Sequence, residues 1–156
     1  MDIIEFGFQH KMKLVIQRVK SAKVKIDQQC YGRINQGLVI FLGIAQNDNR
    51  QDAVYLIKKL LNMRIFNDRD SKMNLSVQDL NLSLMIISQF TLYADNTKGN
   101  RPSFIDAAKP KIAKPLYEFF IKEIQKYNIN FTTGKFGAMM DIELINDGPV
   151  TIVIES

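Results

Sequence analysis

Hydrophobic and polar residues alternate along several short stretches of the chain, which is the pattern of half-buried β-strands. The stretch Lys13 to Val19 alternates in this way, and it predicts a first strand in which Arg18 falls on the same apolar face as Leu14. Val24 and Ile26 alternate with polar neighbours and predict a second strand. The first part of the chain is therefore expected to be rich in β-structure.

Uninterrupted apolar runs predict strands that are buried on both faces. These runs span residues 38–42 and 84–87. Shorter or alternating segments predict further strands at residues 64–66, 130–133, 140–145 and 150–154. Together with the two strands near the start, this makes about seven or eight predicted strands.

Two stretches carry apolar residues at the spacing of an amphipathic helix. The first spans residues 48–63, where Asp48 is the expected N-cap and Gln51 completes a capping box. The second is expected to begin near Pro115, because proline suits the first turn of a helix. A short helical turn is also expected over residues 103–108.

The order of these elements predicts the fold class. The strands follow one another without a regular β-α alternation, which favours an α+β protein. Its sheet is expected to be largely antiparallel or mixed, layered and barrel-like, with the two main helices packed on one side. The 156 residues fit one domain, predicted to span residues 12–156. Residues 1–11 are predicted to be an N-terminal extension and a candidate for disorder.

Composition adds expectations about location and partners. Hydrophobic residues make up 46% of the chain, which is enough for a sizeable core. No apolar run is long enough to cross a membrane, and the first residues lack the pattern of a signal peptide, so a cytoplasmic location is expected. The net charge of +5 favours a polyanionic partner such as nucleic acid and a solvated basic face about equally.

The scarcity of histidine and cysteine narrows the chemistry that the chain can perform. His10 is the only histidine and Cys30 the only cysteine. A Ser-His-Asp triad inside the domain and a multi-cysteine zinc site are therefore not expected, and neither is an intrachain disulfide. We expect no metal and no cofactor. Catalysis must then rely on backbone N–H groups, hydroxyls, charged side chains or the substrate itself.

Two short segments place small polar residues and backbone amides at the end of an apolar run, where compact domains often build a site. One is Ser88 to Leu92, with the sequence SQFTL, and the other is Asn146 to Thr151, with the sequence NDGPVT. The bond between Gly148 and Pro149 can be cis at small cost, and a fixed cis bond turns carbonyls in a direction that a trans chain cannot reach. This segment is a candidate for recognising a ligand by its shape.

These segments belong to a longer series of motifs. The series is VIQRV at 15–19, GLV at 37–39, RIF at 64–66, KMN at 72–74, SQFTL at 88–92, GNRPSF at 99–104, TGKFGAMM at 133–140 and NDGPVT at 146–151. In order and spacing, the chain from Met12 to Ser156 closely resembles the D-aminoacyl-tRNA deacylases, also called D-tyrosyl-tRNA deacylases. It departs from that family at Ser71, where glycine is usual, and at residues 81–83, where Asn-Leu-Ser replaces Gly-Gly-Glu.

The resemblance implies an enzyme of translation quality control. Such an enzyme hydrolyses the ester between a D-amino acid and the 3′-terminal adenosine of tRNA, and it also acts on glycyl-tRNA, including glycine mischarged on alanine tRNA. The family forms homodimers with a site at each end of the interface. Gly148 and Pro149 of the partner subunit, joined by a cis bond, would fill the space of an L side chain and so provide chiral proofreading.

The same resemblance assigns individual site residues. The catalytic wall would consist of Ser88, Gln89, Phe90 and Thr91, and Arg18 would orient the Gly148-Pro149 loop. The terminal adenine would be cradled by Phe136, Gly137 and Met140. From their charge, we expect tRNA phosphates to be held by Lys98, Arg101, Lys109 and Lys111, without readout of the sequence. Thr91 has no histidine to act as its base, so we expect attack by water rather than by its hydroxyl. Backbone N–H groups near Phe90 and Thr91 would hold the carbonyl oxygen, and the ribose 2′-OH would help to activate the water.

Two other functions fit part of the pattern. A non-catalytic tRNA-binding module would keep the basic face without the deacylation site. A hydrolase of free D-aminoacyl esters would use the site without the tRNA. Salt separates the second alternative from the deacylase, because hydrolysis of a tRNA ester should weaken steeply as ionic strength rises, whereas hydrolysis of a small neutral ester should not.

Overall fold

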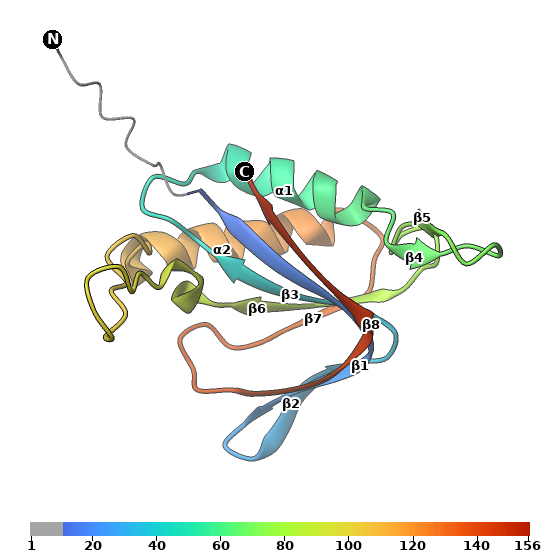
Figure 1. Ribbon diagram of the computed structural model, residues 1–156, viewed down its shortest axis with the longest axis horizontal. Helices are drawn as coiled ribbons and strands as arrows, with labels where there is room; N and C mark the ends of the chain where they lie inside the picture. Colours follow the sequence, from blue (N-terminus) through green and yellow to red (C-terminus); the bar gives the residue numbers. More distant parts are fainter. Residues whose placement is uncertain (1–10) are drawn as a thin grey trace, which may run out of the picture.

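The computed structural model describes residues 11–156, so nearly all of the predicted extension lies outside the described residues. In chain order the elements are β1 (Lys13–Ile26), β2 (Gln29–Ile34), β3 (Gly37–Gly43), α1 (Arg50–Asn62), β4 (Phe66–Asn67), β5 (Met73–Leu75), β6 (Ser83–Ser88), the 3₁₀ helix η1 (Phe90–Tyr93), α2 (Pro110–Gln125), β7 (Phe131–Thr133) and β8 (Asp141–Glu155). Both α-helices lie on one side of the main sheet, as predicted (Figure 1).

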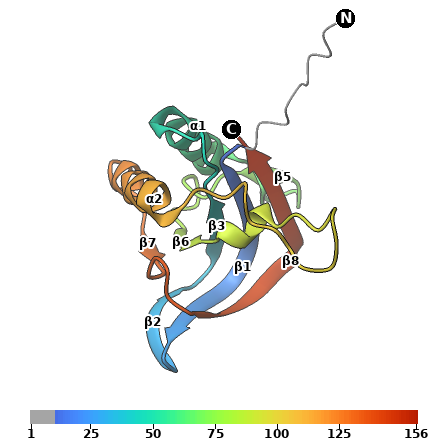
Figure 2. The same ribbon diagram turned by 90° about the vertical axis from the view of Figure 1, so that its left-hand side faces the viewer.

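The main sheet is mixed and strongly curved. Its strand order is β2-β1-β3-β6-β7, and β8 lies along β1. β1 is antiparallel to β2, β3 and β8, whereas β6 is parallel to both β3 and β7. The sheet curls until β2 approaches β7, so that a Cβ on Gly32 would collide with the hydroxyl of Thr132 (Figure 2). The sheet therefore nearly closes into a barrel, and the α+β, barrel-like prediction is confirmed.

β1 is one strand of 14 residues, where the sequence predicted two separate strands. Its pairing with β8 shifts register between Gln17 and Val19 and again between Val19 and Ser21. The buried side chains before and after this irregularity belong to different apolar clusters. Leu14 packs with residues of the helices, whereas Val24 packs in a separate cluster. This switch of the buried face interrupts the alternation in the sequence, although the backbone stays extended. β8 was likewise predicted as two strands and is one interrupted strand.

Two apolar clusters occupy the two faces of the sheet. Leu38 and Ile40 of β3 belong to the cluster that includes residues of both helices, whereas Val39 between them belongs to the cluster on the opposite face. β6 alternates in the same way, with Ile86 in the first cluster and Ile87 in the second. Both strands are buried on both faces, which explains the uninterrupted apolar runs that predicted them correctly.

α1 has a different N-cap from the predicted one. The side chain of Asn49 accepts a hydrogen bond from the backbone N–H of Asp52, and the Asp52 carboxylate accepts one from the N–H of Asn49 at 2.8 Å. The predicted cap, Asp48, instead accepts hydrogen bonds from the N–H of Met12 at 2.9 Å and of Ala45 at 2.6 Å. Burial raises the pKa of the Asp48 carboxyl to about 6.

α2 begins more than a turn before the predicted start. Pro110 occupies its first turn, and Pro115 lies inside the helix. The helix tolerates Pro115 because its apolar stripe, which includes Leu116 and Phe120, packs into the core and outweighs one missing N–H donor. Among the described helices, none is long and apolar enough to cross a membrane.

The connection between η1 and α2 is mostly extended, but one hydrogen-bonded turn interrupts it. The N–H of Ala107 donates to the carbonyl of Phe104 at 3.1 Å, so the turn predicted at residues 103–108 is present over residues 104–107. Ser103 forms an isolated bridge with Asp95 and Ala107 forms one with Ala45, which hold the two sides of the turn against neighbouring segments. A short 3₁₀ helix that was not predicted, η1, lies directly after β6.

The two loops that depart from the family pattern adopt the conformation that glycine favours. Ser71 has a φ of 59° and Asn81 a φ of 51°, both in the left-handed region. Asparagine enters this region more readily than most residues, whereas serine pays a larger steric cost there. The substitutions therefore keep the shape of the loops, and most of the strain falls at Ser71.

Candidate functional site

The segment Ser88 to Thr91 lies at the end of β6, where the buried strand reaches solvent. The N–H of Gln89 donates to the carbonyl of Leu42 at 2.8 Å, which extends the parallel pairing of β6 with β3 by one bond. The chain then turns into η1, and the side chains of Phe90 and Thr91 are exposed. The packing of β6 in the core therefore fixes the position at which these residues reach the surface.

Close packing against β3 fixes the direction of η1. A Cβ on Gly43 would lie 2.9 Å from Cε2 of Tyr93 and 3.3 Å from Cβ of Leu92, so only glycine allows η1 to sit this close. The Tyr93 ring is buried, and its hydroxyl donates to the carbonyl of Lys11 at 2.6 Å. Burial raises the pKa of the Tyr93 hydroxyl far above its usual range, so it acts as a neutral donor.

Thr91 has a polar neighbour but no base. The side-chain amide of Gln89 donates to the Thr91 hydroxyl. Phe90 stands beside them, 57% exposed, with its ring edge-on to Phe104 at a centroid distance of 5.1 Å. The single histidine, His10, lies outside the described residues. Among the described residues, the Gln89 amide is the hydrogen-bond partner found for the Thr91 hydroxyl, and an amide N–H is a donor and not a base.

The segment between β7 and β8 passes the same end of β6. The N–H of Gly134 donates to the carbonyl of Ile86 at 3.1 Å. Met140 packs so closely on Gly134 that a Cβ there would lie 2.5 Å from its sulfur. Phe136 is half-buried and packs on Tyr117 at a ring-centroid distance of 5.6 Å. The predicted adenine-binding residues are therefore brought near the end of the strand that carries Ser88.

Gly137 and Tyr117 complete this part of the site. Gly137 is exposed and has a φ of 76°, which a larger residue would adopt only with strain. Tyr117 is buried, its hydroxyl donates to the carbonyl of Ile86, and burial raises its pKa to about 12. A neutral, anchored Tyr117 holds Phe136 at the rim without adding charge to the site.

The Gly148-Pro149 segment forms a loop that interrupts β8. Gln17 of β1 lies opposite Thr151, and Val19 lies opposite Asn146, so the four residues 147–150 stand opposite Arg18 alone. The peptide bond between Gly148 and Pro149 is cis, and both residues are exposed. The loop projects from the sheet because four residues cannot be accommodated opposite one.

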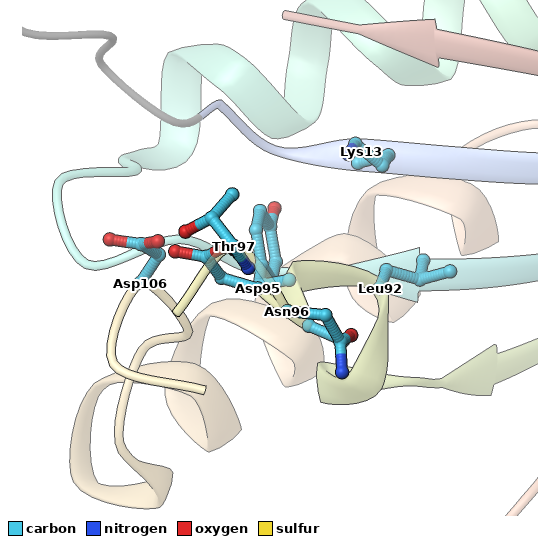
Figure 3. Close-up of a pocket in the computed structure, with 8 residues that line it drawn as sticks. Lys13, Leu92, Asp95, Asn96, Thr97 and Asp106 are labelled. Carbon is cyan, nitrogen blue, oxygen red and sulfur yellow. Dashed lines mark hydrogen bonds between the residues drawn. The ribbon is translucent and has the colours of Figure 1, made fainter. Parts of the chain in front are cut away.

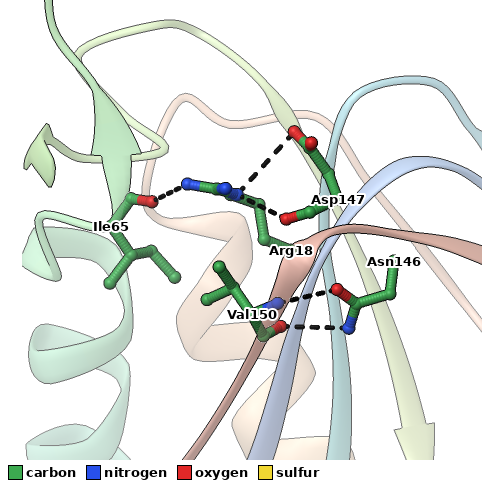
Figure 4. A network of polar contacts seen from close by, with 5 residues as sticks. All are labelled: Arg18, Ile65, Asn146, Asp147 and Val150. Carbon is green, nitrogen blue, oxygen red and sulfur yellow. Dashed lines mark hydrogen bonds and ion pairs between the residues drawn. The ribbon is translucent and has the colours of Figure 1, made fainter. Parts of the chain in front are cut away.

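Polar side chains hold this loop from two sides (Figure 4). Arg18, only 7% exposed, donates through Nε to the carbonyl of Asp147 at 2.9 Å and through Nη1 to the carbonyl of Ile65 at 2.6 Å. Its Nε also lies 3.7 Å from the Asp147 carboxylate. On the other side, the side-chain amide of Asn146 bonds to both backbone groups of Val150. Arg18 is therefore buried beside the loop and bonded to it, and its role in orienting the loop stays a prediction.

Within one chain, the loop and the Ser88 segment do not meet. Ser88 of β6 pairs with Leu42 of β3, and Leu42 pairs with Leu14 of β1. Leu14 lies four residues before Arg18, which stands opposite the loop. Strand geometry places the two segments roughly 13 Å apart along the strands and about 14 Å apart across them. η1 lies at one end of the molecule, whereas Arg18 reaches toward the β4–β5 end (Figures 1 and 4).

The basic residues of the prediction lie around η1. Lys98 and Arg101 are exposed on the loop after it, and Lys109 and Lys111 are exposed at the start of α2. A hollow of about 510 Å³ lies beside this loop, lined by Lys13, residues 92–97 and Asp106 (Figure 3). Within residues 11–156, no group of three or more histidine, cysteine, aspartate or glutamate side chains is placed to hold a metal ion.

Sequence reasoning missed two contributors to the loop. The carbonyl of Ile65 is a backbone group 47 residues from Arg18 and has no signature in the sequence. The role of Asn146 had a weak signal, because an asparagine two residues before glycine is typical of loops that its side chain closes. Neither contributor was distinguishable from an ordinary residue until the strands were paired.

Comparisons with known proteins agree with this architecture. The model of the D-Tyr-tRNA(Tyr) deacylase family matches residues 15–155. A Thermosipho africanus protein named D-aminoacyl-tRNA deacylase is 50% identical over 145 residues, which cover 93% of this chain and 97% of that one. A Finegoldia magna protein of the same name is 53% identical over 145 residues, which cover 93% and 98%.

Solved structures show the same fold. One described as c-Myc DNA Unwinding Element Binding Protein has a TM-score of 0.88 and 37% identity, covering 92% of this chain and 98% of that one. Another, described as a probable eukaryotic D-amino acid tRNA deacylase, has a TM-score of 0.81 at 14% identity, covering 94% and 100%, and supports the fold alone. With a family model that matches nearly the whole chain and relatives at about half identity, the chain belongs to the D-Tyr-tRNA(Tyr) deacylase family.

Proposed function

We propose that this protein hydrolyses the ester bond of D-aminoacyl-tRNA, and of glycine mischarged on alanine tRNA, releasing free tRNA and the amino acid. The observation that carries the proposal is the family match, which runs unbroken from β1 to β8 and so includes both the SQFTL and the NDGPVT segments. Relatives at 50–53% identity carry the name D-aminoacyl-tRNA deacylase. We assign the activity to a single domain, residues 12–156.

The Ser88 to Thr91 segment would form the catalytic wall. The N–H groups of Phe90 and Thr91 stand at the start of η1, before its first internal hydrogen bond, and would hold the carbonyl oxygen as it becomes negative. One such donor is worth about 3–4 kcal/mol. Water would attack the ester with help from the ribose 2′-OH, and Gln89 would hold the Thr91 hydroxyl at the rim.

The chiral filter would be the Gly148-Pro149 loop of a second copy. Because the two segments lie far apart in one chain, a homodimer that places the loop of one copy beside the Ser88 segment of the other would complete each site. Backbone carbonyls of the loop would occupy the space of an L side chain. Repulsion of this kind can exceed the 1–3 kcal/mol or so that a missing methylene contact provides.

The substrate tRNA would lie along the basic surface next to η1. Phe136, Gly137 and Met140 would cradle the terminal adenine. Lys98 and Arg101 would bind phosphates, together with Lys109 and Lys111, without reading the sequence. None of these four cations forms an ion pair with another described residue, so each is available to a phosphate. A substrate of this kind places the protein in the cytoplasm, where tRNA is charged.

The test is hydrolysis of D-tyrosyl-tRNA and L-tyrosyl-tRNA by the purified protein at low and moderate salt, with a free D-tyrosine ester as the small substrate. We expect rapid loss of the D-tyrosyl-tRNA alone, slowing steeply as salt rises. Binding of tRNA without hydrolysis would identify a non-catalytic tRNA-binding module. Salt-independent hydrolysis of the free ester, with none of the tRNA ester, would identify a small-molecule hydrolase.

A further inference from the structure

The backbone groups of the loop that interrupts β8 need hydrogen-bond partners that the sheet does not provide. The pairing of β8 with β1 stops at Asn146 and resumes at Thr151, and the residues between them stand opposite Arg18 alone. Backbone groups that leave a ladder must find other partners, especially where they are partly buried. Val150 is buried at the end of the loop, so its N–H and carbonyl need such partners.

The side chain of Asn146 supplies both of them. Its Oδ1 accepts from the N–H of Val150 at 2.7 Å, and its Nδ2 donates to the carbonyl of Val150 at 3.1 Å. Nδ2 also donates to the hydroxyl of Thr151 at 3.2 Å. A carboxamide carries the same donor and acceptor as a peptide group, so Asn146 replaces the strand partner that Val150 has lost.

The two anchors of the loop have different tasks. Arg18 holds the carbonyl of Asp147 and ties the loop to the carbonyl of Ile65. Asn146 closes the loop on itself, and so sets the distance between its two ends. Gly148 and Pro149, exposed between the anchors, can hold one shape only if both anchors hold.

We propose that Asn146 is a positioning residue that sets D-over-L selectivity by fixing the Gly148-Pro149 loop. The inference rests on the proposed function, because selectivity has a meaning only if the protein hydrolyses the ester. A misplacement of about 1 Å in an active site can change a reaction rate on the order of 100-fold. A loosened loop should speed the hydrolysis of L substrates more than it changes the hydrolysis of D substrates. The loss of selectivity should therefore appear in the ratio of the two rates.

The chemistry of the closure limits which residues can replace Asn146. Aspartate keeps the acceptor for the N–H of Val150, and the Thr151 hydroxyl can turn to donate to it, but its second carboxylate oxygen faces the Val150 carbonyl with no donor between them. Alanine removes all three hydrogen bonds. Thr151→Val removes one acceptor of Nδ2 and keeps the shape, whereas Thr151→Ser keeps the hydroxyl.

The experiment compares four variants with the wild-type protein, namely Asn146→Ala, Asn146→Asp, Thr151→Val and Thr151→Ser. The matched control is Asn62→Ala, since the Asn62 side chain also bonds to a backbone carbonyl, that of Lys58, but at the end of α1. For each protein we would measure hydrolysis rates of D-tyrosyl-tRNA and L-tyrosyl-tRNA, the melting temperature, and hydrogen exchange of the Val150 amide.

We expect Asn146→Ala and Asn146→Asp to lower the D-to-L rate ratio by about 10-fold or more, with faster exchange at Val150. Thr151→Val should lower the D-to-L rate ratio about two- to five-fold, and Thr151→Ser should keep the wild-type ratio. Asn62→Ala should leave the ratio unchanged. Thr151→Val keeps the test valid if the Asn146 variants fail to fold.

The outcomes separate the inference from the function on which it rests. An unchanged ratio in folded Asn146 variants, with Val150 exchanging faster or a lower melting temperature, would overturn the inference and leave the function intact. A wild-type protein that hydrolyses neither ester would overturn the proposed function, and the selectivity role with it. Unchanged exchange at Val150 would show that Asn146 does not close the loop.

Discussion

The Ser88 to Thr91 segment follows the end of β6, the Asn146 to Thr151 loop interrupts β8, and the two are held in opposite ways. The first is placed by the core, because β6 is buried on both faces and η1 packs against Gly43. The second leaves the ladder altogether and is held by two polar side chains, one on either side. The comparison indicates that packing fixes the Ser88 to Thr91 segment, whereas a few hydrogen bonds determine the shape of the loop.

This difference predicts different kinds of damage. If the proposed roles hold, changes beneath the first segment should alter the rate on every substrate alike, because they would move the groups that act on the ester. Changes at the loop should alter the ratio between D and L substrates, because they would move the groups that exclude one of them.

The largest effect is expected from Arg18→Ala. The change removes a nearly buried guanidinium and leaves the carbonyls of Ile65 and Asp147 without their donor. We expect a loss of about 3 kcal/mol in the free energy of unfolding and a marked fall in the D-to-L ratio. Chemical denaturation and the two hydrolysis rates measure this.

Arg18→Lys is the matched control for that change. It keeps the charge but cannot donate to two carbonyls in the fixed geometry of a guanidinium, so it should recover only part of the loss. Full stability and selectivity in Arg18→Ala would show that the loop does not need this anchor.

A smaller effect is expected from Gly43→Ala, which tests the first segment. The new Cβ would lie 2.9 Å from the buried ring of Tyr93, whose hydroxyl is tied to the carbonyl of Lys11 and leaves it little room to move. We expect about 2 kcal/mol of destabilisation and a similar slowing of hydrolysis on D and L esters. A changed D-to-L ratio at unchanged stability would contradict the division between the two regions.

The pH dependence of stability tests the polar contacts beneath the first segment. The Asp48 carboxyl has a pKa of about 6 when folded, above its usual value near 4, because burial disfavours its charge. The folded state therefore takes up a proton more readily than the unfolded chain, and this contribution to stability is present below about pH 4 and is lost as pH rises through 6. Since the carboxyl is only half-buried, we expect about 1 kcal/mol.

Thermal unfolding between pH 4 and pH 7 checks this with Asp48→Asn as the comparison. The difference in melting temperature between wild type and Asp48→Asn should change across this window, with the wild type gaining stability toward the acid side. A constant difference would show that Asp48 ionises in the folded state as it does in the unfolded one.

The smallest effect is expected from Thr91→Ala. The Thr91 side chain is exposed, and among the described residues its hydroxyl bonds to Gln89, so we expect less than about 0.5 kcal/mol of change in stability. The variant should keep a substantial part of its activity on D-tyrosyl-tRNA in a single-turnover assay. Complete loss of activity in a folded variant would assign the nucleophile to the Thr91 hydroxyl.

The sequence predicted best what the core determines. The runs at 38–42 and 84–87 identified β3 and β6, and alternation placed Arg18 on the buried face of β1. The prediction from sequence failed where a side chain bonds to a group that is distant in the chain. Asp48 looked like an N-cap, yet its carboxylate accepts from Met12, 36 residues away. The closure by Asn146 left only a weak signal in the sequence, because it depends on how β8 pairs with β1.

The central claim is that the two regions act together only between two copies of the chain. We would replace Cys30 by serine, introduce Phe90→Cys and Pro149→Cys together, and treat the protein with a short bismaleimide whose reach is well below the separation within one chain. The account predicts a covalent dimer from the double variant and none from either single variant. A cross-link that forms within the monomer, or none at all while D-tyrosyl-tRNA is still hydrolysed, would contradict it.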